Sequence, residues 1–86
     1  MYTTYVLYSP KYQKIYIGQT ADLDQRMLSH NVLSEKGFTS RFRPWVIIYT
    51  EEYLTRAEAM KREKQLKSSA GRRWIWKLVE DRFGPP

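Results

Sequence analysis

The amino-acid sequence predicts an α+β fold in which a small three-stranded antiparallel sheet is flanked by helices, in the order β-β-α-β-α-α. Three observations lead to this prediction. Two strand-like segments separated by a turn open the chain, and a third, strongly apolar segment lies near its middle. Helix-capping signals precede the remaining segments. With 86 residues the chain suffices for one core, so we predict a single domain over residues 1–83 and a frayed tail over residues 84–86.

The strands are predicted from residue type and from the breakers between them. Residues 2–8 are rich in Tyr, Thr and Val, which favour strands, and Pro10 ends this segment. Residues 14–18 then form the second strand of a hairpin. Residues 45–49 give the strongest strand signal, and their continuous apolar run predicts burial on both faces.

The first helix is predicted over residues 20–31. Asp22 supplies its N-terminal cap, and the side chains of Leu23 and Met27 lie one turn apart and should face the core. The polar, glycine-containing stretch over residues 32–43 is predicted to be a loop.

Two further helices follow the third strand. Thr55 and Glu58 have the spacing of a capping box, and the helix they open should end between residues 67 and 69. A last helix is predicted over residues 72–82. The side chains expected to face inward are Ala59, Met60 and Leu66 on the first of these helices, and Trp74, Ile75, Leu78 and Val79 on the second.

Charge and composition narrow the functional classes. Fifteen Lys and Arg against nine Asp and Glu give a net charge of +6, which favours a polyanionic partner, although a merely basic soluble protein has the same composition. The absence of cysteine excludes disulfides and thiolate metal sites. The apolar runs are too short to span a bilayer, and the first residues lack the pattern of a signal peptide. We therefore expect a cytoplasmic protein without a membrane partner.

Glu63 is a candidate metal ligand. It is i+4 from Ala59 and i−3 from Leu66, which places it on or beside the inward stripe of its helix. A carboxylate in that position needs a partner, because burying an unpaired charge is costly. The partner could be a divalent cation or simply Lys67, which follows at the favourable i+4 spacing.

Four more polar side chains could act on a phosphodiester. Arg26 and His30 share a helix face at i, i+4 spacing, where Arg could hold the phosphate and His could move a proton. Tyr16 and Gly18 point to the same side of a strand, and the missing side chain of Gly18 could let a ligand approach the phenol. Tyr5 lies in the paired strand. Each also has a structural interpretation: a solvated helix face, or a tyrosine packing a small sheet.

The remaining basic and aromatic residues suggest nucleic-acid contacts. The basic side chains late in the chain could follow a phosphate backbone or could simply form a solvated surface. We expect Trp45 and Trp74 to pack in the core and Trp76 to be partly exposed, where it could serve a partner. The candidate nucleic-acid contacts are Gly18, Lys14, Arg41, Arg43 and Lys67.

The order and spacing of these residues resemble the GIY-YIG nuclease family. Tyr5 is followed eleven residues later by Tyr16-Ile17-Gly18, and then by Arg26 and His30. Thr3-Thr4-Tyr5 stands where the family has Gly-Ile-Tyr, so only the tyrosine of the first half-motif is kept.

The second half of the chain extends this resemblance. The segment 62–67 is similar to the family's second-helix motif, whose glutamate binds the metal. The resemblance covers residues 3–80 and is nearest to compact single-domain members, which are similar to the nuclease domain of the bacterial excision-repair incision subunit. A family asparagine after the second helix has no match in residues 68–71, and Phe38 stands near the position of a second histidine found in some members.

The resemblance implies phosphodiester hydrolysis with one metal ion, Mg²⁺ or Mn²⁺. Glu63 would bind that ion, and Arg26 would stabilise the charge of the transition state. Tyr16 or Tyr5 would hydrogen-bond the attacking water or take its proton. His30 would orient a phenol or relay its proton.

The implied function is that of a metal-dependent endonuclease acting on DNA, branched or single-stranded, in repair or recombination. A protein partner would supply specificity, because so short a chain has little surface for reading sequence. One alternative is a nucleic-acid-binding module of the same fold with little or no catalytic activity. Another is a protein-interaction domain that uses Trp76 and the basic helices.

Overall fold

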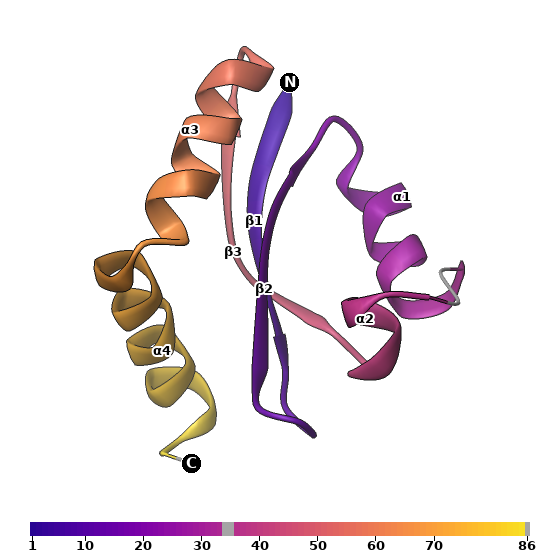
Figure 1. Ribbon diagram of the computed structural model, residues 1–86, viewed down its shortest axis with the longest axis vertical. Coiled ribbons are helices and arrows are strands. Elements are labelled where there is room, and N and C mark those ends of the chain that lie inside the picture. The colour runs from indigo at the N-terminus through magenta and orange to yellow at the C-terminus, as the bar shows by residue number, and fades with distance from the viewer. Residues whose placement is uncertain (34–35, 86) are drawn as a thin grey trace.

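The computed structural model describes residues 1–33 and 36–85, and it contains a three-stranded antiparallel sheet between two layers of helices (Figure 1). Strand β1 (Tyr2–Ser9) lies between β2 (Lys14–Thr20) and β3 (Val46–Tyr53) and pairs antiparallel with both. The α+β class and the order of the elements are as the sequence predicts. Residue 86 of the expected tail lies outside the described residues.

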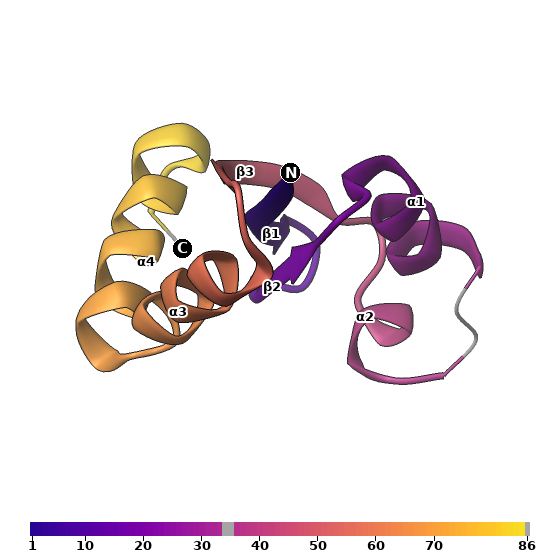
Figure 2. The same cartoon turned by 90° about the horizontal axis from the view of Figure 1, so that it is seen from above.

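The helices divide between the two faces of the sheet (Figure 2). On one face α1 (Leu23–Leu28) runs directly into a π-helical turn, η1 (Ser29–Leu33), and a short α2 (Phe38–Arg41) lies beside them. On the other face lie α3 (Arg56–Leu66) and α4 (Ser69–Phe83). No helix in the described part of the chain has the length and apolar character needed to cross a membrane.

The period-2 alternation of β1 builds a separate core on each face. Tyr5 and Leu7 pack with Trp45 beneath α1, where Leu23 and Met27 add partly buried surface as predicted. The intervening side chains of β1 point to the opposite face. The core there consists of Val6, Tyr8, Ile17, Ile48, Leu66, Ile75 and Val79.

The helix caps follow the predicted signals. The Asp22 carboxylate accepts a hydrogen bond from the Gln25 backbone N–H at 3.1 Å and starts α1. Thr55 accepts from the Glu58 N–H at 3.2 Å and donates to the Glu58 carboxylate at 2.9 Å, which completes the capping box of α3.

The prediction that residues 45–49 are buried on both faces is wrong. Strand β3 is an edge strand, and its Val46 and Ile47 side chains are exposed. β1 takes the centre because it pairs with both neighbours, and its six residues from Thr4 to Ser9 are buried. An apolar run alone therefore did not distinguish a central strand from an edge strand with one covered face.

The predicted loop over residues 32–43 contains the additional helix α2, although residues 34 and 35 lie outside the described residues. Gly37 precedes α2 with a left-handed φ of 100°, a conformation that glycine adopts without strain. The Ser40 hydroxyl donates to the Gly37 carbonyl at 2.8 Å, and the indole N–H of Trp45 donates to the Thr39 carbonyl at 2.8 Å. Tertiary hydrogen bonds thus stabilise a helix too short to have a sequence signal.

Two side chains predicted to face the core do not. Met60 and Trp74 are exposed, and Trp74 instead packs its edge against Tyr49, with ring centroids 4.8 Å apart. The inward positions of α3 are Ala59 and Leu66, both buried. Met60 follows Ala59 directly, so the helix rotates it about 100° away from the sheet.

Candidate active site

Four of the five predicted catalytic side chains meet on the α1 face of the sheet. Tyr5 comes from β1, Tyr16 from β2, Arg26 from α1 and His30 from the π-helical turn. They surround a shallow pocket of about 330 Å³, which is lined by Tyr16, Arg26, Ser29, His30, Phe38 and Thr39. Tyr5 lies beneath this pocket with no exposed surface.

A chain of hydrogen bonds connects three of these side chains. The Arg26 Nε–H donates to the Tyr5 hydroxyl oxygen at 3.4 Å, and that hydroxyl lies 2.9 Å from His30 Nε2. Burial raises the pKa of Tyr5 to about 12, although its hydrogen bond with Arg26 acts in the opposite direction. The phenol is therefore protonated at neutral pH, and its hydroxyl is hydrogen-bonded to the imidazole.

The imidazole of His30 is a hydrogen-bond acceptor at neutral pH. Burial lowers its pKa, and the positive charges of Arg26 and Arg43 lower it further. The sequence interpretation of a solvated Arg–His face holds for the exposed Arg26 but not for His30, which is buried. His30 lies in the π-helical turn η1, and its ring is covered by the rings of Tyr5 and Tyr16.

Two residues outside the predicted catalytic set hold the π turn in place. Asn31 accepts from the Trp45 backbone N–H at 2.7 Å and donates to the Trp45 carbonyl at 3.2 Å, as a paired strand would. Arg43 donates to the His30 carbonyl at 2.6 Å and to the Ser29 carbonyl at 3.3 Å. Nothing in the local sequence signals these contacts, because they join segments brought together only by the fold.

Gly18 makes room for Tyr5. The two residues are directly paired between β1 and β2, and a Cβ atom on Gly18 would lie 2.7 Å from the Tyr5 hydroxyl oxygen and 2.8 Å from its Cζ. The sequence suggested that the missing side chain admits a ligand. The structure fills that space with the protein's own phenol, so glycine is required for the packing of Tyr5.

Tyr16 is the phenol that faces the pocket. Its side chain is half-buried, and its ring lies 4.8 Å from the His30 ring and 6.2 Å from the Tyr5 ring, measured between centroids. Hydrogen bonding to Tyr5, with a smaller contribution from Tyr16, raises the pKa of Arg26. The guanidinium is thus held between the two phenols and stays charged.

Glu63 approaches this group from α3, in the helix layer on the opposite face of the sheet (Figure 2). Its side chain is 22% exposed, and Lys67 Nζ donates to Glu63 Oε2 at 2.6 Å. The negative charge of Glu63 contributes to the raised pKa of Tyr5, after the larger effects of burial and of the nearer side chains. The carboxylate therefore helps to raise the pKa of Tyr5. At the same time it is paired with Lys67, the alternative partner that the sequence indicated.

The residues at Glu63 fit a single hard cation. The described part of the chain contains no group of three or more His, Asp or Glu side chains that could enclose a metal ion. Mg²⁺ commonly uses one or two carboxylates and completes its shell with water and substrate phosphate. Glu63 would be the single carboxylate ligand of such an ion, in place of the Lys67 ammonium that pairs with it in this structure.

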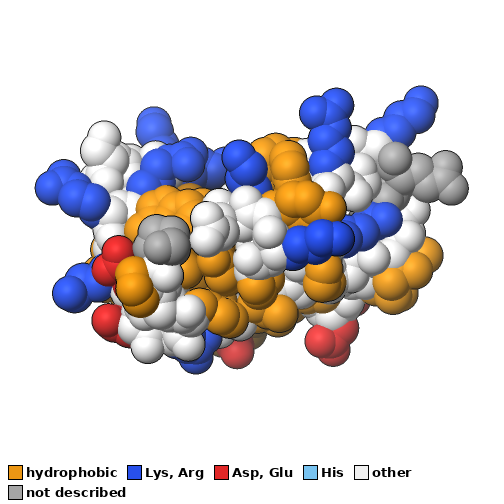
Figure 3. Space-filling model, turned by 90° about the horizontal axis from the view of Figure 1, so that it is seen from below, with side chains coloured by type: hydrophobic (Ala, Val, Ile, Leu, Met, Phe, Trp, Pro, Cys, Tyr) orange, Lys and Arg blue, Asp and Glu red, His pale blue; other side chains and the backbone are white. Residues whose placement is uncertain are grey.

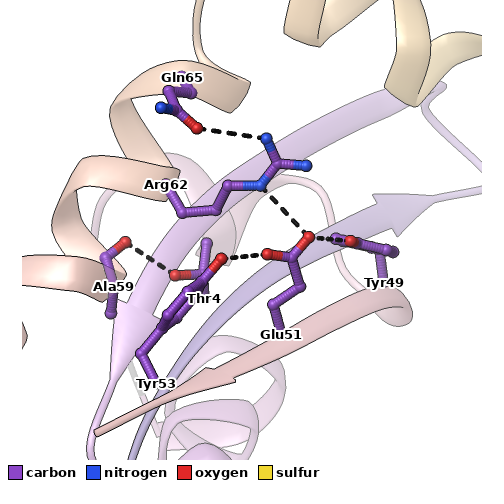
Figure 4. Close-up of polar contacts among 7 residues, drawn as sticks. All are labelled: Thr4, Tyr49, Glu51, Tyr53, Ala59, Arg62 and Gln65. Atoms are coloured by element: carbon purple, nitrogen blue, oxygen red, sulfur yellow. Dashed lines mark hydrogen bonds and ion pairs between the residues drawn. The ribbon is translucent and has the colours of Figure 1, made fainter. Parts of the chain in front are cut away.

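A second polar cluster holds α3 against β3 (Figure 4). The Glu51 carboxylate accepts hydrogen bonds from the hydroxyls of Tyr49 and Tyr53, and Arg62 Nε donates to it at 3.2 Å. Arg62 also donates to Gln65 at 3.3 Å. Because Arg62 immediately precedes Glu63, this cluster fixes the rotation of the helix that carries the candidate metal ligand.

This cluster was not among the predicted sites. Its signal is the alternation of Tyr49, Glu51 and Tyr53 along one face of a strand, opposite a basic helix position. Burial raises the pKa of Glu51, but the hydrogen bonds from Tyr49, Tyr53 and Arg62 outweigh it and lower the pKa overall. The carboxylate is therefore ionised at neutral pH.

The predicted nucleic-acid contacts lie in different settings. Lys14 is exposed at the start of β2, with its ammonium 5.5 Å from the centre of the Phe42 ring. Arg41 is exposed at the end of α2, the helix whose Phe38 and Thr39 line the pocket. Arg43 and Lys67 are engaged by the contacts described above. Their binding to nucleic acid stays a prediction.

Comparison with known proteins identifies the family of this chain. A model of the GIY-YIG catalytic domain matches residues 1–77 of the chain. A UPF0213 protein of Staphylococcus haemolyticus is 31% identical over 72 residues, which cover 84% of this chain and 87% of the relative. A UPF0213 protein of Staphylococcus saprophyticus is 30% identical over 67 residues, which cover 78% and 80%. The chain therefore belongs to the GIY-YIG family, a family of nucleases.

Proposed function

We propose that this protein is a divalent-metal-dependent endonuclease that hydrolyses phosphodiester bonds in DNA. The observation that carries the proposal is the convergence of Tyr16, Arg26 and His30 on one pocket above the buried Tyr5. The Glu63 carboxylate lies near enough to influence the phenol of Tyr5. A cation can stabilise charge on a phosphate, a phenol or an imidazole can move a proton, and a carboxylate can bind a metal ion.

Arg26 is the residue we assign to the scissile phosphate. Its guanidinium is exposed at the pocket, and one N–H is anchored on Tyr5, which leaves the other donors to reach a ligand. A planar guanidinium suits two phosphate oxygens at once and stabilises the charge that develops as water attacks.

The two phenols have different roles in this proposal. Tyr5 is fully buried, makes hydrogen bonds with both Arg26 and His30, and has a pKa raised to about 12 by burial, so we assign it to positioning. Tyr16 lines the pocket and is the phenol that can hydrogen-bond the attacking water or take its proton. His30, held neutral, hydrogen-bonds the Tyr5 hydroxyl and packs its ring against Tyr16.

Glu63 would hold one Mg²⁺ or Mn²⁺ ion, with Lys67 displaced from the carboxylate. The bound ion would supply charge stabilisation at a non-bridging phosphate oxygen. We propose branched or single-stranded DNA as the substrate, in repair or recombination, with a partner protein supplying specificity, because the pocket is shallow.

Cleavage assays with matched variants test this function. Single-stranded, nicked and branched DNA are incubated with Mg²⁺ or Mn²⁺ and wild-type protein, Glu63→Gln or Arg26→Ala, and Lys64→Ala serves as the control because Lys64 is an exposed neighbour on α3. We expect cleavage by wild type and Lys64→Ala only. Cleavage that survives both site substitutions contradicts the mechanism. Salt-sensitive binding without cleavage of any substrate would favour the nucleic-acid-binding module instead.

A further inference from the structure

A second concave surface lies between the β1–β2 turn and the C-terminal half of α4. It is a groove of about 500 Å³, larger than the pocket at Tyr16. Tyr8 forms its floor, with the Trp76 ring 6.1 Å away and edge-on, and the Phe83 ring 4.9 Å away, both measured between centroids. Its other lining residues are Pro10, Gln13, Val79, Glu80, Gly84 and Pro85.

The walls of this groove present aromatic surface to solvent. Trp76 is 37% exposed and Phe83 is 46% exposed, whereas Tyr8 beneath them is only 5% exposed. Single exposed aromatic residues are common on proteins, but three rings that face one hollow form a flat-sided apolar slot. A planar ligand fits such a slot better than a flexible alkyl chain does.

The surroundings of the groove are basic. Arg73 lies one turn before Trp76 on the same side of α4, Lys77 follows Trp76, and Lys11 adjoins Pro10 in the turn. All three are exposed, and among the residues that the structure describes none of them forms an ion pair. Seen from below, this side of the molecule shows hydrophobic side chains with Lys and Arg along the upper edge and Asp or Glu at the left and lower edges (Figure 3). The rim therefore attracts an anion.

Glu80 places the opposite charge inside the groove. Its carboxylate has no ion-pair partner within residues 1–33 and 36–85. A phosphate in the groove would be repelled by this carboxylate, whereas a ring with N–H donors on its edge would be bound by it. An aromatic slot with one acceptor inside and cations outside matches the two parts of a nucleotide, a base and a phosphate.

We propose that this groove is a second nucleic-acid subsite, which binds an unpaired base of a single-stranded segment. The base lies against Trp76 and Phe83, Glu80 accepts hydrogen bonds from its edge, and Arg73 and Lys77 contact the flanking phosphates. The inference depends on the proposed function only in taking nucleic acid as the ligand.

The acceptor in the groove also predicts which base binds best. Guanine offers adjacent imino and amino donors that a carboxylate can accept together. Thymine offers one N–H between two carbonyl oxygens, which the Glu80 carboxylate repels. Guanine is therefore preferred over thymine at this subsite.

The groove and the candidate active site can engage one strand. Tyr8 and Tyr5 belong to the same strand, three residues and about 10 Å apart, and face opposite sides of the sheet. A single-stranded flank that leaves the pocket at Tyr16 reaches the groove by passing around the β1–β2 hairpin. Binding of that flank gives a preference for substrates with unpaired nucleotides next to the cleaved bond.

Fluorescence polarisation in metal-free buffer tests the subsite without cleavage. The probes are a labelled thymine-only oligonucleotide and the same oligonucleotide with one guanine at its centre. Trp76→Ala and Phe83→Ala should each weaken binding of the guanine probe about tenfold, the usual effect of losing one base–aromatic stack. Glu80→Gln should abolish the difference between the probes. Trp74→Ala is the control, because Trp74 is equally exposed at 39% on α4 but packs on Tyr49 outside the groove.

Each outcome decides a separate point. Thermal unfolding checks that every variant is folded. If Trp76→Ala does not fold, Trp76→Phe, which keeps a smaller ring, takes its place and should weaken binding by less than about tenfold. Equal affinity of wild type, Trp76→Phe and Phe83→Ala overturns the inference. A dimer that dissociates on substitution of Trp76 also overturns it, because a second copy would then occupy the groove.

The assay also separates this inference from the proposed function. Groove-dependent binding by a protein that cuts no DNA contradicts the endonuclease alone. DNA cleavage without any dependence of binding on Trp76 or Phe83 contradicts the subsite alone.

Discussion

Substituting Gly18 by alanine should damage both the stability of the protein and its candidate active site. The added Cβ would lie 2.7 Å from the Tyr5 hydroxyl oxygen, 2.8 Å from Tyr5 Cζ and 3.1 Å from Tyr16 Cε1, whereas ordinary contacts begin at 3.4 Å. The Tyr5 phenol must therefore move by 3.4 − 2.7 = 0.7 Å. It has no exposed surface and is bonded to His30 and Arg26, so it has no free direction in which to move.

The cost follows from the packing. Overfilling a close-packed core costs about 1–3 kcal/mol. In a domain of this size each kcal/mol lowers the melting temperature by about 4–8 °C. Because the same movement displaces Arg26, we expect the cleavage rate to fall about a hundredfold, the order of loss that small misplacements of catalytic groups produce.

Urea unfolding followed by tryptophan fluorescence, together with single-turnover cleavage, measures the two effects. Ile17→Val is the matched control, since Ile17 precedes Gly18 on β2 but packs in the core on the opposite face. It should lower the free energy of unfolding by about 0.5–1.5 kcal/mol and leave the cleavage rate unchanged. If Gly18→Ala has wild-type stability and rate, the described packing of Tyr5 is refuted.

Three further substitutions test charge and protonation. Glu63→Gln should abolish cleavage. It should change the unfolding free energy by less than about 1 kcal/mol, because the ion pair of Glu63 with Lys67 is partly exposed. A larger decrease of the unfolding free energy, measured with urea, would instead make Glu63 a structural residue. His30 has a folded pKa below its unfolded value of 6.5, so the unfolded state binds the extra proton first, and stability should fall as the pH drops below about 6.5. Melting temperatures of His30→Gln should show a weaker fall, and equal slopes would contradict the neutral imidazole. Glu51→Gln should lower the unfolding free energy by about 1–3 kcal/mol, because it weakens the hydrogen bonds of the cluster. The control Glu52→Gln should not, because Glu52 is exposed. Equal melting temperatures of the two variants would contradict the role of the cluster.

Local signals in the sequence were sufficient for most of the fold. The hairpin, the cap at Asp22 and the capping box at Thr55 depend on neighbouring residues, and each is present in the structure. The place of β3 in the sheet was not predictable in this way. An apolar run reports that a strand is covered, but strand order depends on pairing between β1 and β3, which are far apart in the sequence.

The candidate site was predictable as a set of residues but not as a geometry. The order of Tyr5, Tyr16, Arg26 and His30 pointed to one site, and the structure brings these side chains together. The burial of His30 was missed because it depends on Tyr5 and Tyr16, which lie on strands distant from His30 in the sequence. The role of Gly18 was misread, since only the register of the hairpin reveals that Tyr5 lies opposite it.

The supporting residues were beyond sequence reasoning for a different reason. Arg43 was expected to contact a ligand, yet its guanidinium bonds the carbonyls of Ser29 and His30. A side chain in a loop carries no periodic pattern, so its partner is set by tertiary structure alone. The same holds for Glu51, whose importance comes from Arg62 on another element.

The metal dependence of single-turnover DNA cleavage tests the central claim most directly. We predict that the rate for wild-type protein rises from zero to a plateau as Mg²⁺ or Mn²⁺ is added, and that Glu63→Gln stays inactive at every metal concentration while it still binds the DNA. Cleavage by wild type in the presence of a chelator, or a Glu63→Gln variant with the wild-type metal response, would contradict the assignment of Glu63 as the metal ligand of this nuclease fold.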